Sequence, residues 1–147
     1  MLMLSLDPGG TTGAALLEFD SDNVNLIRTW QIPNGVSGFH DWYWDELHEG
    51  YFFDVIVCES FNLREGLHGV DLTPTYVIGA LEAYYYPQQV IYQEPKLKPL
   101  CDDSRLKLMG LHEKGKPHAN DAVRHGIIYL RNRKHRPTLM KGWANED

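Results

Sequence analysis

The chain has 147 residues, of which 43% are hydrophobic and 23% are charged. This length and composition are typical of one globular domain, and they exclude a disordered or fibrous protein and an ATPase built from two lobes. No apolar run reaches the ~18 residues that span a bilayer, and the first residues lack the basic start and the small-residue cleavage site of a signal peptide. Two cysteines, Cys58 and Cys101, are too few for a disulfide framework, so we expect a reducing, cytoplasmic location.

The charge is unevenly distributed along the chain, although the formal net charge is −6. Residues 1–90 carry two basic and thirteen acidic residues, a net charge of −11, whereas residues 91–147 carry twelve basic and seven acidic residues, a net charge of +5. Such asymmetry indicates a basic surface directed at a polyanion such as nucleic acid, and a solvated basic tail is the alternative.

The first part of the chain predicts a meander of three strands. Residues 2–7 form a short apolar run that stops at an Asp-Pro-Gly-Gly turn. Residues 13–19 form a second apolar run after this tight, glycine-rich link. Residues 24–32 alternate between apolar and polar side chains, as in a partly exposed strand. The short links favour antiparallel pairing.

The middle of the chain predicts helices that alternate with strands. Residues 37–50 fit an amphipathic helix capped by Ser37. Residues 54–59 are apolar on both pleat faces, which is typical of a central strand covered on both sides. A loop then leads to a helix over 73–86, for which Thr73 is a good N-cap, followed by a proline in the first turn.

The last part predicts one more strand and one long helix. The strand covers residues 89–93, and residues 94–117 are basic and interrupted by prolines, with one short helix around 103–111. A helix follows over residues 118–131, and residues 132–147 form a basic, loosely ordered C-terminal tail.

This order of elements predicts an α/β fold in which a mixed five-stranded sheet has helices on both faces. The sheet begins as an antiparallel meander and continues with parallel strands. One domain then covers residues 1–131, and the basic tail covers residues 132–147.

Three acidic residues stand at the ends of these elements. Asp7 ends the first strand, Glu59 ends the most apolar strand, and Asp121 lies in the first turn of the last helix. If the first and fourth strands are neighbours, Asp7 and Glu59 meet at one end of the sheet. Converging carboxylates repel each other, and a hard divalent cation such as Mg²⁺ or Mn²⁺ relieves that repulsion. The alternative for each acid alone is a solvated strand end or a helix N-terminus stabilised by the helix dipole.

The strings LSLDPGGTTGAALLE, DVIVCES and HANDAVRHGIIYLR, in this order and spacing, resemble the RNase H-like superfamily. Within it they are most similar to the RuvC-type Holliday junction resolvases, including those of bacteriophages, and the resemblance extends to about Arg131. It implies an RNase H-like nuclease domain. It also implies a structure-selective endodeoxyribonuclease that resolves four-way and related branched DNA junctions by paired nicks, with no nucleotide cofactor and no membrane partner.

The resemblance also implies the residues of the site. Asp7, Glu59, His118 and Asp121 match the four side chains that bind two Mg²⁺ or Mn²⁺ ions and carry the catalysis. His118 departs from the pattern, since many relatives have another Asp there. It therefore stays open whether His118 binds metal, moves a proton or contacts the scissile phosphate, and a helix-capping or surface histidine is the alternative.

A zinc site is a second interpretation of the same helix. His118, Asp121 and His125 have i, i+3, i+7 spacing, which places them on one side of a helix, and histidine is a common zinc ligand. The neighbouring carboxylates and the lack of a nearby cysteine disfavour this interpretation. We therefore expect His125 to be structural or to support a neighbouring ligand.

Aromatic and basic residues near these motifs are candidate DNA contacts. In resolvases the loop that corresponds to residues 60–72 enters the junction, where an aromatic such as Phe61 stacks on an unpaired base beside a cation such as Arg64. Phe61 as a core anchor is the alternative. Resolvases also carry basic residues after the fifth strand, which here are Lys96, Lys98, Arg105, Lys107, Lys114 and Lys116.

The helix over 73–86 resembles the helix at the dimer interface of the family, which implies a homodimer. A C₂ dimer presents two sites to a junction with two-fold character. Packing of this helix against the sheet is the alternative.

Three other functions fit part of the sequence. Residues 7–13 resemble the phosphate loop of actin-like and sugar-kinase-like ATPases, but a second glycine-rich loop and the length for two lobes are missing. A nuclease of the same fold that acts on RNA–DNA hybrids or flapped DNA is a stronger rival, because a fold does not fix a substrate. A non-catalytic module that binds branched DNA is disfavoured by the intact acids.

Overall fold

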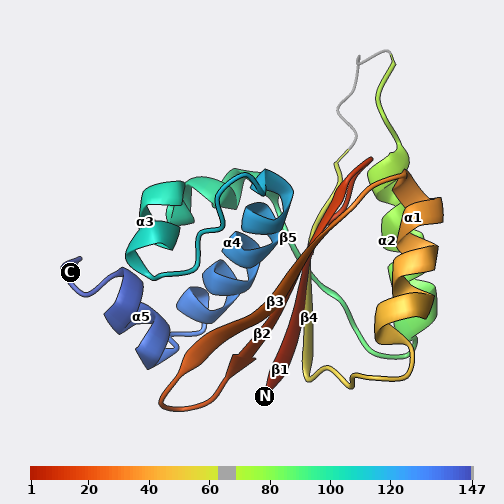
Figure 1. Cartoon of the computed structure of the whole chain (residues 1–147). Coiled ribbons are helices and arrows are strands. Elements are labelled where there is room, and N and C mark those ends of the chain that lie inside the picture. Colours follow the sequence, from red (N-terminus) through yellow and green to blue (C-terminus); the bar gives the residue numbers. More distant parts are fainter. Residues whose placement is uncertain (63–68, 147) are drawn as a thin grey trace.

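The computed structural model describes residues 1–62 and 69–146, and these residues form a five-stranded sheet between two layers of helices (Figure 1). The strands are β1 (Leu2–Asp7), β2 (Thr12–Phe19), β3 (Val24–Ile32), β4 (Val55–Glu59) and β5 (Ile91–Gln93). Their order in the sheet is β3-β2-β1-β4-β5. β1, β2 and β3 pair antiparallel, β4 is parallel to β1, and β5 is parallel to β4, which confirms the predicted mixed sheet.

The helices cover both faces of the sheet. They are α1 (Gly35–Trp42), the π-helical turn η1 (Tyr43–Leu47), α2 (Thr73–Tyr85), the 3-10 helix η2 (Pro95–Cys101), α3 (Asp103–Leu108), α4 (Pro117–Asn132) and α5 (Arg136–Gly142). α1 and α2 lie on one face, and α3, α4 and α5 lie on the other (Figure 1). None of the helices in the described part of the chain combines the length and the apolar character needed to cross a bilayer.

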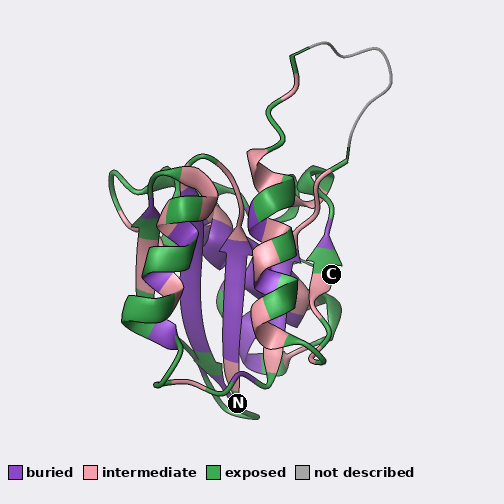
Figure 2. Cartoon of the chain, turned by 90° about the vertical axis from the view of Figure 1, so that its right-hand side faces the viewer, coloured by how far each residue is buried: buried purple, intermediate pink, exposed green. Residues whose placement is uncertain are grey.

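The alternation of side chains along β1 sets which residues face α4. Met3 belongs to the core on the α4 side, whereas Leu4 and Leu6 belong to the core beneath α1 and α2. Because both faces are covered, the central strands are buried along most of their length (Figure 2). Since the side-chain period of a strand is two, Asp7 projects to the face of Met3, toward α4. The same period in β4 places Glu59 on the α4 side.

α4 lies unusually close to the sheet. The hydroxyl of Ser5 on β1 donates to the carbonyl of Ala122 on α4 at 2.6 Å. Gly13 on β2, directly opposite Asp7, leaves room for the first turn of α4, because a Cβ atom there would lie 1.8 Å from the carbonyl oxygen of His118. These contacts place the first turn of α4 over the end of β1.

A side chain from the sheet also caps α4. The residue before the helix, Lys116, makes no side-chain cap. Instead, the side-chain oxygen of Gln31 on β3 accepts hydrogen bonds from the backbone N–H groups of His118 at 2.9 Å and Ala119 at 3.3 Å. The first N–H groups of a helix have no partner within it, so Gln31 supplies one from a distant strand.

One predicted helix start and one predicted helix cap are wrong. α1 begins at Gly35, before the predicted Ser37 cap, because Asn34 turns the chain in a left-handed conformation at φ 71°. The backbone N–H of Gly35 then donates to the carbonyl of Gly10 at 2.9 Å, which fixes the start of the helix.

Thr73 is not the N-cap of α2, since it already belongs to the helix. The carboxylate of Asp71 accepts hydrogen bonds from the N–H of Thr73 at 2.9 Å and from its hydroxyl at 2.6 Å. Because the Asp71 side chain engages both the backbone N–H and the hydroxyl of Thr73, the hydroxyl does not cap the helix, and Thr73 becomes its first residue.

The predicted loosely ordered tail is also wrong, because residues 136–142 form α5. Thr138 and Trp143 are buried, and Trp143 joins the core on the α4 side. The guanidinium of Arg105 lies 4.5 Å from the centre of the Trp143 ring, and that of Arg131 lies 5.4 Å from it. Because this segment is mostly basic, its few apolar residues, which attach it to the domain, were not recognised as core residues in the sequence.

We predict that Gly13→Ala lowers the free energy of unfolding by about 1–3 kcal/mol, because the new methyl group collides with the backbone of α4 rather than with a side chain that can move. Gly10→Ala is the matched control, since nothing lies within 4 Å of its Cβ position, and it should change stability by less than about 0.5 kcal/mol. Urea unfolding followed by circular dichroism measures both. Equal effects of the two substitutions would contradict the close approach of α4.

Candidate functional site

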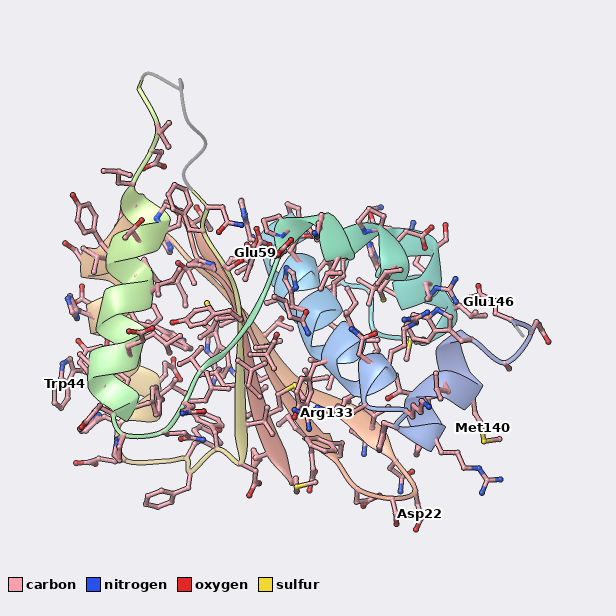
Figure 3. All side chains as sticks on the ribbon, turned by 180° about the vertical axis from the view of Figure 1, so that it is seen from behind. Asp22, Trp44, Glu59, Arg133, Met140 and Glu146 are labelled. Atoms are coloured by element: carbon pink, nitrogen blue, oxygen red, sulfur yellow. The ribbon has the colours of Figure 1, made fainter. Side chains whose placement is uncertain are left out.

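Three carboxylates from separate elements meet at the carboxyl ends of β1 and β4, and one ammonium group contacts two of them. The Nζ atom of Lys98 on η2 lies 3.0 Å from Oε2 of Glu59 and 3.3 Å from Oδ2 of Asp121. Asp7 is close enough to Glu59 for the two carboxyl groups to share a hydrogen bond. Figure 3 shows Glu59 beside the first turns of α4, which carry Asp121. The structure thus brings together Asp7, Glu59 and Asp121, three of the four predicted site residues.

The electrostatics of the cluster depend on burial and on like charges. Burial and the neighbouring charge of Glu59 raise the pKa of Asp7 to about 8, although Lys98 opposes this shift. Burial also raises the pKa of Glu59, but hydrogen bonds from His125 and Lys98 outweigh it and hold that pKa below its usual range. Lys98 is partly desolvated, yet its carboxylate partners raise its pKa, so it stays charged.

The donor set of this cluster fits a hard divalent cation. Carboxylate oxygens are the ligands that Mg²⁺ and Mn²⁺ prefer, and the repulsion that raises the pKa of Asp7 is what such a cation relieves. Within residues 1–62 and 69–146, no three His, Cys, Asp or Glu side chains are arranged around a common metal position. Lys98 lies between two of the carboxylates instead. A metal ion bound by Asp7, Glu59 and Asp121 would therefore have to displace the Lys98 ammonium group.

Two buried residues of α4 support the carboxylates. His125 is fully buried, and its Nε2 lies 2.7 Å from Oε2 of Glu59. The buried guanidinium of Arg124 donates to Asp121, to Asp103 and to the carbonyl of Cys101. Arg124 thereby ties α4 to η2 and α3. This role of Arg124 was not predicted, because the only signal for it in the sequence is its position three residues after Asp121.

His118 has a different environment from the other predicted ligands. It lies in the first turn of α4, one turn before Asp121, and its side chain is exposed. Among the described residues, no hydrogen bond or ion pair involves its ring, and its structural contacts are made by its backbone. The zinc alternative is wrong, because both ring nitrogens of His125 face protein partners, Glu59 and Gln93.

Several of the basic residues predicted to contact DNA are paired with acids in the structure. Lys96 lies 2.8 Å from Glu94, and Lys116 lies 2.9 Å from Glu113. Both pairs are half exposed, so they are weak and exchange readily. The contacts of these residues with DNA stay predictions.

The other basic residues of this set divide into two kinds. Arg105 donates to Glu146 and to the carbonyl of Gly142 at the end of α5, which gives it a structural role. Lys107 and Lys114 are exposed, and neither makes an ion pair with a described residue. They remain accessible to a polyanion.

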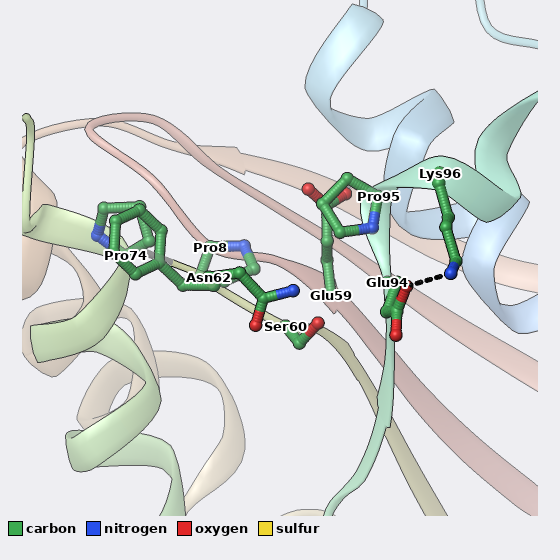
Figure 4. Close-up of a pocket in the computed structure, with 9 residues that line it drawn as sticks. Pro8, Glu59, Ser60, Asn62, Pro74, Glu94, Pro95 and Lys96 are labelled. Carbon is green, nitrogen blue, oxygen red and sulfur yellow. Dashed lines mark ion pairs between the residues drawn. The ribbon is translucent and has the colours of Figure 1, made fainter. Parts of the chain in front are cut away.

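A pocket of about 330 Å³ opens beside Glu59 (Figure 4). It is lined by Pro8, Glu59, Ser60, Phe61, Asn62, Pro74, Glu94, Pro95 and Lys96. Phe61 lines this pocket and belongs to neither buried core, so the core-anchor alternative is wrong. Arg64, the other predicted contact of this loop, lies outside the described residues.

We predict that the raised pKa of Asp7 makes the free energy of unfolding fall as the pH rises. Between about pH 4 and pH 8 the folded chain keeps a proton on Asp7 that the unfolded chain, with a pKa of 3.8, has lost. Asp7→Asn removes this dependence. As the pH rises from about 4 to 8, the free energy of unfolding of the variant should therefore increase relative to that of the parent by at least ~1 kcal/mol, since one pKa unit corresponds to ~1.4 kcal/mol. Urea unfolding in EDTA at several pH values tests this. Parallel pH profiles for the two proteins would contradict it.

No protein-family model and no curated protein sequence matches this chain. Several solved structures have the same fold, among them two of a fowlpox virus protein. The fowlpox virus Holliday junction resolvase has a TM-score of 0.66 and 14% identity, over 90% of this chain and 99% of that chain. The complex of fowlpox virus resolvase with substrate Holliday junction DNA has a TM-score of 0.65 and 15% identity, over the same shares of the two chains. At this identity the likeness shows the fold alone, and it confirms that the chain has the RNase H-like α/β fold of that resolvase.

Proposed function

We propose that this protein is a metal-dependent, structure-selective endodeoxyribonuclease that resolves four-way and related branched DNA junctions by paired nicks. The observation that carries the proposal is the convergence of Asp7, Glu59 and Asp121, beside the Lys98 ammonium, at the carboxyl ends of the inner strands β1 and β4. The shared fold supports it, because the viral neighbour is a Holliday junction resolvase that has been solved with its junction DNA.

In this proposal, Asp7, Glu59 and Asp121 hold two Mg²⁺ or Mn²⁺ ions, and His118 completes the set from the exposed first turn of α4. When bound, such a pair of ions activates a water molecule and stabilises the leaving 3′ oxygen of a phosphodiester. Lys98, released from the carboxylates, contributes its ammonium group to a phosphate oxygen.

The proposed DNA contacts come from the loop after β4 and from the basic segment after β5. The exposed Lys107 and Lys114 contact phosphates directly. Lys96 and Lys116 contact phosphates after they leave their present partners, Glu94 and Glu113. Phe61 at the pocket beside Glu59 offers a face on which a base can stack, with Arg64 nearby in the sequence.

The protein is proposed to act as a homodimer through α2. Val77 and Leu81 of α2 are buried against the sheet, so they cannot form an interface. Tyr76 on the outer side of the same helix is 60% exposed, and it is the large apolar group that α2 presents to a second copy. A two-fold dimer places two sites on the two equivalent strands of a junction.

The direct test compares substrates. Purified protein is incubated with four-way, flapped, RNA–DNA hybrid and linear duplex substrates, with and without Mg²⁺ or Mn²⁺. We expect paired, symmetric cuts in the four-way junction that require the metal. Asp7→Asn should lose at least ~100-fold in cleavage, because a ligand is lost, and should still bind the junction. Equal cutting of the hybrid would indicate the rival nuclease, and binding without cutting by the parent would indicate a non-catalytic module.

The dimer has a separate prediction. Tyr76→Glu places a charge in the proposed interface, so the protein should sediment as a monomer while the parent sediments as a dimer. Leu108→Glu is the matched control, because Leu108 is 72% exposed on α3, on the opposite face of the sheet, and should leave the dimer intact. A monomeric parent at micromolar concentration would refute the homodimer.

A further inference from the structure

A buried hydrogen-bond chain runs from the backbone of α4 through Gln93 and His125 to Glu59. We propose that Gln93 and His125 are a positioning pair, in which Gln93 fixes the tautomer of His125 and His125 presents one fixed N–H donor to the Glu59 carboxylate. The inference rests on the proposed function, since it gives Glu59 the orientation that a metal ligand needs.

Strand register brings the two ends of this chain together. Glu59 on β4 and Gln93 on β5 are directly opposite each other. Residues that are directly opposite in a sheet project to the same face, which here is covered by α4. His125 lies between them, with Nε2 2.7 Å from Glu59 and Nδ1 2.9 Å from the Gln93 amide. The ring is fully buried, and Gln93 is 6% exposed, so neither residue has water as a substitute partner.

The backbone of α4 determines which way the Gln93 amide points. One end of the amide lies 3.1 Å from the carbonyl oxygen of His125, which can only accept, and the other end lies 3.2 Å from the N–H of Tyr129, which can only donate. The hydrogen-bond network therefore assigns the amide nitrogen to the His125 side and the amide oxygen to the Tyr129 side. The reverse orientation would set acceptor against acceptor and donor against donor.

This orientation fixes the proton of the imidazole. The amide nitrogen of Gln93 donates to Nδ1 of His125, so Nδ1 must accept and carries no proton. The ring proton is then on Nε2, which donates to Oε2 of Glu59. The backbone groups of His125 and Tyr129 thus determine, through the Gln93 amide, that His125 presents an N–H donor to Glu59.

The donor limits the freedom of the Glu59 carboxylate. His125 and Lys98 both contact Oε2, but Lys98 sits on a flexible and partly exposed side chain, whereas His125 is held rigidly in the core. When Lys98 moves aside for a metal ion, His125 is the contact that stays. Hydrogen bonds of this kind to a ligating carboxylate typically matter ~10–100-fold in metal affinity.

The test is a calorimetric titration of the full chain with Mn²⁺. His125→Leu removes the donor and should weaken Mn²⁺ binding ~10–100-fold. His125→Gln can place an amide N–H near the Nε2 position and should recover most of this loss. Gln93→Met, which removes the group that sets the tautomer, should weaken binding in the same direction as His125→Leu.

His135→Leu is the matched control for a purely structural effect. His135 also uses both ring nitrogens, with Thr138 at 2.8 Å and the carbonyl of Asp20 at 2.6 Å, but its partners are in the β2–β3 turn and in α5. It should lower the unfolding temperature and leave the Mn²⁺ affinity at the parent value. If the His125 variants also lose stability but bind Mn²⁺ like the parent, the positioning role is overturned.

A spectroscopic measurement decides the point even where His125→Leu does not fold. Long-range ¹H–¹⁵N spectra of the metal-free parent should show a protonated Nε2 and an unprotonated Nδ1 for His125. A proton on Nδ1 would overturn the positioning pair and leave the proposed function standing. A parent that shows the expected tautomer but binds no Mn²⁺ at millimolar concentration would overturn the proposed function, and the positioning role with it.

Discussion

The site depends on the repulsion between carboxylates that the fold forces together. β1 and β4 are adjacent and parallel, so Asp7 and Glu59 emerge side by side, and α4 adds Asp121. In the structure two features reduce the repulsion. Burial and the charge of Glu59 raise the pKa of Asp7 to about 8, so that it holds a proton, and the ammonium of Lys98 contacts Glu59 and Asp121. A carboxylate cluster of this kind attracts cations in general. On the proposed function, a divalent ion competes with the Lys98 ammonium for these carboxylates.

α4 organises most of this arrangement, because within five residues it carries one of the three carboxylates, Asp121, and the partners of two of them, Arg124 and His125. Its first turn is placed by the absence of a side chain at Gly13 and by the cap from Gln31. Asp121 contacts Lys98 of η2, Arg124 contacts η2 and α3, and His125 contacts β4 and β5. Since most of the helix is buried, its apolar pattern shows no single face in the sequence, and its buried polar residues Asn120, Arg124 and His125 are each hydrogen-bonded.

The sequence predicted the sheet and its helices well where the signal was local. Alternation and short turns predicted the meander, and the apolar run of β4 predicted a central strand, so the meeting of Asp7 and Glu59 followed. Long-range partners were not predictable. Nothing local in the sequence indicates that Gln31 caps α4, that Arg105 stacks on Trp143 or that Gln93 faces Glu59, because each pairing depends on register or packing between distant segments. The same limit hid α5, whose attachment depends on a single buried tryptophan and its neighbours.

The pairing of basic residues changes how the uneven charge acts. The exposed pairs of Lys96 with Glu94 and of Lys116 with Glu113 are worth little, so a phosphate can replace either acid at small cost. Lys98 differs, because it is half-buried against two carboxylates, and its removal alone would leave them uncompensated. On the proposed function, a metal ion in its place would supply that compensation, and a DNA phosphate would then be a partner for the released ammonium. On the proposed function, metal and DNA binding therefore favour each other through this one side chain, and by linkage the coupling has the same size in both directions.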